Sequence, residues 1–135
     1  MRVLLVQDST GHNTGYRVIG RALRDAGIEV ILGGVLLPQE IARLAVEEGV
    51  DAIGYRIMDA SPVVLVERLM QELQRVGLGD LPVVVGGIVR AEDLQRLCDL
   101  GVVQVFHPGT TLAAIAGFFR GLGSLRAFSP REGSR

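Results

Sequence analysis

Short apolar runs alternate along the chain with longer stretches in which apolar residues recur every three or four positions. The runs are rich in Val and Ile and mostly unbroken, a pattern typical of strands buried on both faces of a sheet. They cover Val3–Val6, Glu29–Leu32, Ala52–Tyr55, Pro82–Val85 and Val103–Phe106. Each run is followed by an amphipathic stretch; the first of these carries Val18, Ile19, Ala22, Leu23 and Ala26 on one helical face. The pattern therefore predicts strands that alternate with helices along the whole chain.

This alternation predicts a parallel sheet with right-handed crossovers and helices on both faces. We expect an α/β fold of the flavodoxin-like (Rossmann-like) kind, with five parallel strands in the order 2-1-3-4-5. In such sheets ligands bind beyond the carboxyl ends of the strands, near the switch point between the first and third strands. The loops that meet there are Gln7–Gly15, Arg56–Pro62, Gly86–Arg90 and His107–Thr111. One domain is expected over residues 1–121, followed by a tail rich in Gly, Ser and Arg, residues 122–135, that we expect to be disordered.

Composition and charge narrow the classes of function. The chain of 135 residues has a formal net charge of −1, which argues against nucleic acid or an acidic membrane as a partner. All 14 basic residues are Arg, so mechanisms that require a Schiff-base lysine or a phosphate-binding lysine are excluded. Cys98 is the only cysteine, so one chain forms neither a disulfide nor a thiolate metal site. No apolar run is long enough to cross a bilayer and the start does not resemble a signal peptide, so a cytoplasmic protein is expected.

The loop after the first strand carries the strongest candidate for chemistry. It holds His12 between Gly11 and Gly15, two residues that allow a ligand to approach the backbone closely. An imidazole at the switch point can ligate a metal ion or act as an acid or base. From position alone, a solvent-exposed histidine that caps the following helix is the favoured explanation of the same residue.

Several segments together resemble a known family. Residues 11–19, Gly-His-Asn-Thr-Gly-Tyr-Arg-Val-Ile, resemble the cobalamin-binding signature Asp-x-His-x-x-Gly and the helix that follows it. The other similar segments are Gly33–Gly34 with Pro38–Glu40, Asp51–Gly54, Val83–Ile88, and Gly101–Phe106 with Pro108–Thr110. The resemblance covers residues 2–120, and it is to the cobalamin (B12)-binding domain of the methylmalonyl-CoA mutase family, which occurs as a C-terminal domain or a small subunit.

In that family the histidine is the lower ligand of the cobalt, and the displaced nucleotide tail of the cofactor lies between the sheet and the first helix. The resemblance therefore implies that His12 ligates the cobalt of adenosylcobalamin. The cofactor-binding residues that it implies are Thr10, Gly11, His12, Asn13, Thr14, Gly15, Arg56, Met58, Gly86, Gly87, Pro108, Gly109 and Thr110.

The resemblance also implies a division of labour between two chains. A domain of this size cannot contain the TIM barrel that performs mutase chemistry. We therefore expect a small subunit that presents the cofactor to a separate, larger barrel subunit, which binds an acyl-CoA and carries out a radical carbon-skeleton isomerisation. No catalytic residue is expected in this chain, and a homo-oligomer is compatible with the arrangement.

Two residues depart from the motifs of the family. Thr10 stands where the family has an aspartate, whose carboxylate accepts the second ring N–H of the histidine and raises its basicity. A hydroxyl accepts the same bond more weakly, and Asp8 is an alternative acceptor if the loop folds back. Arg56 stands where the family has a serine that faces the buried benzimidazole. The arginine either fills the tail pocket, which would weaken or abolish cobalamin binding, or turns outward to Asp59, Asp8 or a phosphate.

Other functions fit parts of the same sequence. A stand-alone cobalamin carrier or sensor would share the motifs without a catalytic partner. A degenerate relative that no longer binds cobalamin, and acts as a structural or regulatory partner, is favoured by Thr10 and Arg56. Asp8 and Asp59 suggest a phospho-receiver, but the chain lacks the lysine that such a domain needs after its fifth strand. His107, which the family does not use, is expected only at the rim of the site.

Overall fold

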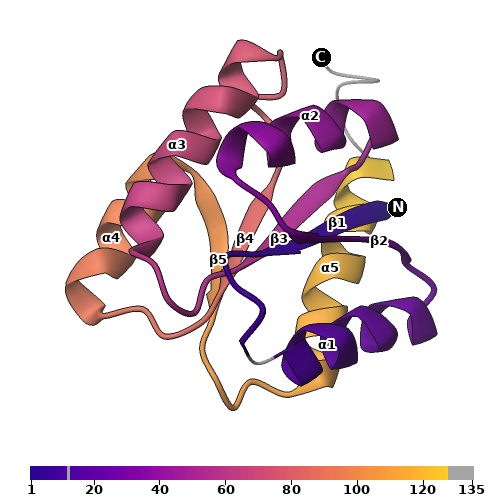
Figure 1. Ribbon diagram of the computed structural model, residues 1–135. Helices are drawn as coiled ribbons and strands as arrows, with labels where there is room; N and C mark the ends of the chain where they lie inside the picture. The colour runs from indigo at the N-terminus through magenta and orange to yellow at the C-terminus, as the bar shows by residue number, and fades with distance from the viewer. Residues whose placement is uncertain (12, 128–135) are drawn as a thin grey trace.

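The computed structural model describes residues 1–11 and 13–127, which form a five-stranded parallel sheet covered by helices on both faces (Figure 1). The elements in chain order are β1 (Arg2–Gln7), α1 (Asn13–Asp25), β2 (Glu29–Val35), α2 (Pro38–Glu48), β3 (Ala52–Arg56), α3 (Pro62–Arg75), β4 (Val83–Gly86), α4 (Ala91–Leu100), β5 (Val102–Phe106) and α5 (Leu112–Ala127). The strand order is β2-β1-β3-β4-β5, so the predicted flavodoxin-like topology is confirmed. The switch point lies between β1 and β3, as expected.

The strands overlap every predicted run, and the largest difference is in β2. The prediction ended this strand at Leu32, but pairing with β1 continues through Val6↔Gly34 and Gln7↔Val35 after a register shift. Glycines have little intrinsic preference for strands, and the hydrogen-bonding partner decides the assignment here.

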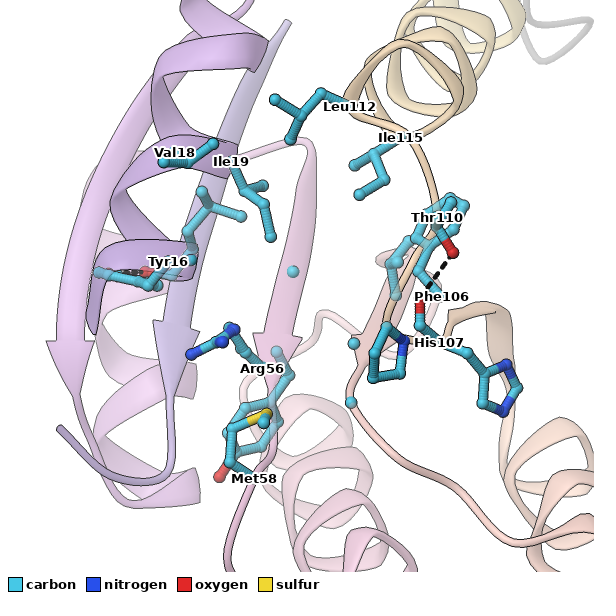
Figure 2. A pocket seen from close by; sticks show the side chains of 18 of the residues that line it. Tyr16, Val18, Ile19, Arg56, Met58, Phe106, His107, Thr110, Leu112 and Ile115 are labelled. Carbon is cyan, nitrogen blue, oxygen red and sulfur yellow. Dashed lines mark hydrogen bonds between the residues drawn. The ribbon is translucent and has the colours of Figure 1, made fainter. Parts of the chain in front are cut away.

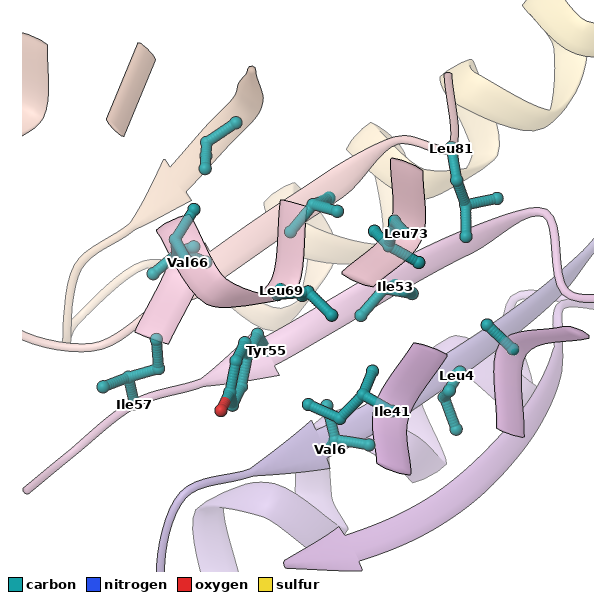
Figure 3. Close-up of a cluster of buried hydrophobic side chains, with 14 of the residues drawn as sticks. Leu4, Val6, Ile41, Ile53, Tyr55, Ile57, Val66, Leu69, Leu73 and Leu81 are labelled. Carbon is teal, nitrogen blue, oxygen red and sulfur yellow. The ribbon is translucent and has the colours of Figure 1, made fainter. Parts of the chain in front are cut away.

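Alternation along each strand divides the core into two layers. Leu4, Val6, Ile53 and Tyr55 face α2, α3 and α4, where Figure 3 shows Tyr55 and Ile53 packed with Leu69 and Leu73. The residues that alternate with them face α1 and α5 and pack with helical side chains. They are Val3 and Leu5 of β1, Ala52 of β3 and Val84 of β4, together with Tyr16, Leu23, Ile115 and Phe119. Each fully buried side chain of this kind contributes about 1.5–3 kcal/mol relative to exposure, so both layers hold the sheet.

The helix ends follow from local chemistry. Pro38 and Pro62 occupy first helical positions, and the Ser61 hydroxyl accepts a hydrogen bond from the Val64 amide at 3.4 Å. Gly49 ends α2 with φ of +61° and Gly101 ends α4 with φ of +109°, conformations that other residues adopt at a cost. The starts of α2 and α3 lie at the carboxyl edge of the sheet, whereas Gly49 and Gly101 lead to the next strand at the opposite edge.

The last helix continues beyond the predicted domain end. The sequence placed that end at residue 121, whereas α5 runs to Ala127, and Leu122 packs against the layer between α1 and the sheet. Residues 128–135, the rest of the predicted tail, lie outside the described residues. Among the helices of the described chain, none combines the length and the apolar character that crossing a membrane requires.

Candidate functional site

A cavity of about 290 Å³ lies between α1 and α5, on the face of the sheet that these helices cover, and reaches the carboxyl ends of β3, β4 and β5 (Figure 2). Its walls are apolar side chains of the two helices: Val18 and Ile19 from α1, and Leu112, Ile115 and Phe119 from α5. Its floor consists of Leu5, Gly54 and Val84 from the three central strands. A flat apolar group therefore fits between the helices.

Two glycines determine the shape of the cavity. A Cβ atom on Gly54 would lie 2.6 Å from Cδ2 of Leu5 and 3.5 Å from Cζ of Phe119, so glycine lets these side chains close over β3. At Gly86 an added Cβ would meet only the Phe106 carbonyl oxygen, at 3.9 Å, so the end of β4 leaves room for a ligand. Gly54 and Gly86 lie on the same face of neighbouring strands, because Tyr55 and Val85 point to the opposite layer.

Tyr16 fixes the start of α1 beside the cavity. Its hydroxyl donates to the Leu5 carbonyl oxygen at 2.7 Å and accepts from the Gly34 amide at 2.9 Å. Gly34 lies where the β1–β2 register shifts, so the hydroxyl pairs an amide at the irregular point of the sheet. Burial raises the pKa of Tyr16 above its ordinary value, although the bond from Gly34 opposes this, so the hydroxyl stays protonated and can donate.

Asp8 joins the loop after β1 to the loop after β3. Its carboxylate accepts from the amides of Met58 at 2.8 Å, Asp59 at 2.9 Å and Ala60 at 2.8 Å. Burial raises the pKa of Asp8, but the backbone hydrogen bonds outweigh it, so the pKa is lowered from its ordinary value and the carboxylate is charged. This carboxylate, suggested above as a partner for the histidine or as a phosphate acceptor, is engaged in holding two loops together.

Arg56 lies at the end of β3 on the same face as Gly54, and its half-buried side chain lines the cavity rather than filling it. Figure 2 shows the guanidinium directed from β3 toward α1. An added Cβ on Gly15 would lie 2.8 Å from its Nη2 atom, so a glycine at this position in α1 makes room for the arginine. The side chain of Arg56 therefore borders the cavity, and whether it obstructs a cofactor tail or binds a phosphate stays a prediction.

The glycine pair after β4 has different roles at its two positions. Gly87 has φ of +141°, and a Cβ there would collide with the Ile57 carbonyl oxygen of the neighbouring loop. The Gly87 amide donates a hydrogen bond to the Phe106 carbonyl oxygen at 3.0 Å, and the Ile57 amide donates to the Gly86 carbonyl oxygen at 2.9 Å. Gly87 is thus required by the protein's own backbone, although it also lines the cavity, whereas Gly86 leaves room for a ligand.

The turn after β5 completes the edge of the cavity. Thr110 donates from its hydroxyl to the His107 carbonyl oxygen at 2.7 Å, and Pro108 and Gly109 line the cavity beside it. The His107 ring lies 3.3 Å from the Val89 carbonyl oxygen and points away from the apolar walls (Figure 2). It is a rim residue, as the sequence indicated.

The structure gathers part of the predicted site around this cavity. The predicted residues that line it are Gly15, Arg56, Met58, Gly86, Gly87, Pro108, Gly109 and Thr110. Thr10, Gly11 and Thr14 are described but do not line it, and Asn13 begins α1. His12, the predicted cobalt ligand, lies outside the described residues, so its role stays a prediction. Within residues 1–11 and 13–127, no three His, Cys, Asp or Glu side chains are grouped as a metal ion would require.

Sequence reasoning missed the apolar part of the cavity. Leu5, Gly54 and Phe119 come from β1, β3 and α5, and none of them belongs to a loop at the carboxyl edge. A signal was present in β3, where Ala52 and Gly54 occupy alternate positions and leave one face of a central strand without bulky side chains until Arg56 at its end.

A family model and two similar proteins point to the same kind of domain. A family model described as the B12 binding domain matches residues 3–116. The chain is 35% identical over 128 residues to the 2-hydroxyisobutanoyl-CoA mutase small subunit of Aquincola tertiaricarbonis, covering 93% of this chain and 94% of that subunit. It is 38% identical over 103 residues to the methylmalonyl-CoA mutase large subunit of Streptomyces virginiae, covering 76% of this chain but 14% of that one.

Among solved structures, a cobalamin-binding protein from Desulfitobacterium hafniense DCB-2 superposes with a TM-score of 0.73 at 18% identity. The match covers 90% of this chain and 58% of that one. At this identity the likeness concerns the fold alone.

Proposed function

The chain belongs to the family of B12-binding domains, and from this premise we propose that it binds adenosylcobalamin as the small subunit of an acyl-CoA mutase. The coverage of 94% of a curated small subunit supports a separate small chain. In this proposal a larger subunit in the cytoplasm binds the acyl-CoA in a TIM barrel and carries out the isomerisation.

The observation that carries the proposal is the apolar cavity between α1 and α5, beside the switch point of the sheet. Its apolar walls and floor, among them Ile19, Val84 and Phe119, suit the flat base of a nucleotide tail. Gly86 would let the tail pass close to the backbone of β4. In the sequence, His12 directly precedes Asn13, the first residue of α1, and it would supply an imidazole to the cobalt.

The residues of this chain would bind and orient the cofactor. Tyr16 holds the first turns of α1 against β1 and β2, and Asp8 holds the loop after β3, so both sides of the site are fixed before a ligand arrives. The apolar side chains of α1 and α5 would exclude water from the tail. When bound, adenosylcobalamin supplies the radical that starts the isomerisation, and the proteins around it position it.

Visible spectroscopy tests the proposal. The purified chain is mixed with hydroxocobalamin or adenosylcobalamin, free ligand is removed, and the absorption spectrum of the protein fraction is recorded. We expect a retained corrinoid, and a changed spectrum for the His12→Ala variant if the imidazole ligates the cobalt. No retention of either form at micromolar protein would overturn binding by the isolated chain and favour the degenerate relative.

A pair of glycine variants connects binding to the cavity. Gly54→Ala places a methyl group 2.6 Å from Cδ2 of Leu5, which pushes that side chain into the cavity, and should weaken retention. Gly117→Ala is the matched control, because an added Cβ there meets no atom within 4 Å. Equal retention by both variants, with unchanged circular dichroism, would place the corrinoid tail elsewhere.

A further inference from the structure

We propose that Arg56 determines specificity in this cavity by binding a phosphate, so that the site selects corrinoids with a complete nucleotide tail over corrinoids that lack the phosphate and base. This inference rests on the proposed function and names the chemical group that one residue would recognise.

The first argument is the position of Arg56. It is the last residue of β3, in register with Gln7 of β1 and Gly86 of β4, and therefore in the middle of the carboxyl edge. Alternation along β3 puts its side chain on the face of Gly54, the face that α1 and α5 cover. From there the side chain is directed toward α1, as Figure 2 shows, and its Nη2 atom would lie 2.8 Å from a Cβ added to Gly15.

The second argument is charge. Among the described residues that line the cavity, Arg56 is the only permanently charged one, and the others, apart from His107, are apolar, glycine or neutral. The His107 ring is directed away from the walls toward Val89. A ligand whose apolar end enters the cavity would therefore bring an anionic group close to one cation, the Arg56 guanidinium at the edge of the cavity.

The third argument is the kind of cation. A guanidinium presents parallel N–H donors that match two oxygens of one phosphate, which a lysine or a serine cannot do. A corrinoid nucleotide carries one phosphodiester between its ring substituent and its base. With the base between α1 and α5, the phosphodiester would lie outside the apolar part of the cavity, where Arg56 is placed. Glycine at position 15 keeps this position open to the arginine, since a larger residue would displace its Nη2 atom.

The test compares the affinities of cobalamin and cobinamide, a corrinoid without phosphate, ribose or base, for the full chain and its variants. Arg56→Gln should lower the affinity for cobalamin by about 10- to 100-fold, the range for loss of charge-assisted hydrogen bonds. The affinity for cobinamide should stay within about twofold of the wild-type value. Arg56→Lys should restore part of the loss, because it keeps the charge without the fork. Arg68→Gln on the exposed face of α3 is the matched control and should change neither affinity.

A second pair of probes separates phosphate binding from stacking of the guanidinium on the base. In the wild-type chain the 3′-phosphate of α-ribazole should displace cobalamin at lower concentration than α-ribazole itself, and Arg56→Gln should remove that difference. Equal competition by both compounds in the wild-type chain would overturn the phosphate assignment.

The outcomes distinguish this inference from the proposed function. A wild-type chain that binds cobalamin, with Arg56→Gln or Arg56→Ser binding equally or more tightly, would overturn the inference alone and identify the arginine as an obstruction. Parallel losses for cobalamin and cobinamide would also overturn it, since they indicate general damage. A wild-type chain that binds no corrinoid would overturn both.

Discussion

Removing the hydroxyl of Tyr16 tests how the start of α1 is held. In Tyr16→Phe the Gly34 amide loses its partner at 2.9 Å, at the register shift between β1 and β2, and the Leu5 carbonyl oxygen loses a donor at 2.7 Å. The Tyr16 side chain is 6% exposed, so water replaces the hydroxyl only in part.

The expected loss of stability follows from the two backbone groups that lose the hydroxyl, the Gly34 amide and the Leu5 carbonyl oxygen. A buried polar group without a partner costs about 1–3 kcal/mol. The Leu5 carbonyl lies inside the paired region of β1, so the half-buried Gly34 amide accounts for most of the loss. We expect the free energy of unfolding to fall by about 2 kcal/mol, which corresponds to a fall in Tm of about 8 °C for a domain of this size.

Urea unfolding followed by far-ultraviolet circular dichroism measures this loss. Tyr55→Phe is the matched control, because it removes the same atom from a buried tyrosine of β3 that does not hold the start of α1, and it should change stability by less than about 0.5 kcal/mol. Tyr16→Phe should also weaken cobalamin retention, since Tyr16 lies in the first turns of the helix that follows His12. A loss below about 0.5 kcal/mol, equal to that of the control, would refute the role given to the hydroxyl.

Three further predictions concern the loops and the core. Asp8→Asn should lower the free energy of unfolding by about 1.5–3 kcal/mol at neutral pH, because it removes the charge that accepts three amides. Because the folded-state pKa of Asp8 is lowered, its contribution is complete above the ordinary value of 3.8 and is lost as the pH falls through the folded-state pKa, so urea midpoints of wild type and variant should converge in acid. Gly87→Ala should destabilise far more than Gly86→Ala in thermal unfolding, since only the former collides with the Ile57 carbonyl oxygen, and equal Tm values would contradict this. Burial raises the pKa of Tyr55 to about 12, so its tyrosinate absorbance should be missing at pH 10 while the chain stays folded, and an ordinary titration there would show the side chain to be exposed.

Much of the fold follows from local sequence. The unbroken apolar runs at Val3–Val6 and Pro82–Val85 could be assigned to strands because a strand buried on both faces needs apolar residues at consecutive positions. Their alternation with helical stretches predicted the sheet order, which is confirmed. The predicted end of β2 at Leu32 was wrong, because Gly34 and Val35 pair with Val6 and Gln7 of β1 after the register shift.

The site, like the fold, could be predicted from the sequence only in part. Loops at the carboxyl edge are fixed by topology, so Arg56, Gly86 and the turn after β5 could be placed near one another from the sequence. The apolar floor and walls could not, because which side chains meet over Gly54 depends on how α5 packs against β1 and β3.

By itself, the sequence determined the fold class, the strand order and the family resemblance, since these depend on periodicity and on short motifs within single segments. Only the tertiary structure decided the rest. In the folded chain, the Asp8 carboxylate accepts hydrogen bonds from amides some 50 residues away. The Ile57 carbonyl oxygen leaves no space for a side chain at Gly87, and the Arg56 side chain lies beside Gly15 at the cavity. These contacts join residues that are distant in the chain, and their geometry exists only when the strands are in register and the helices are packed.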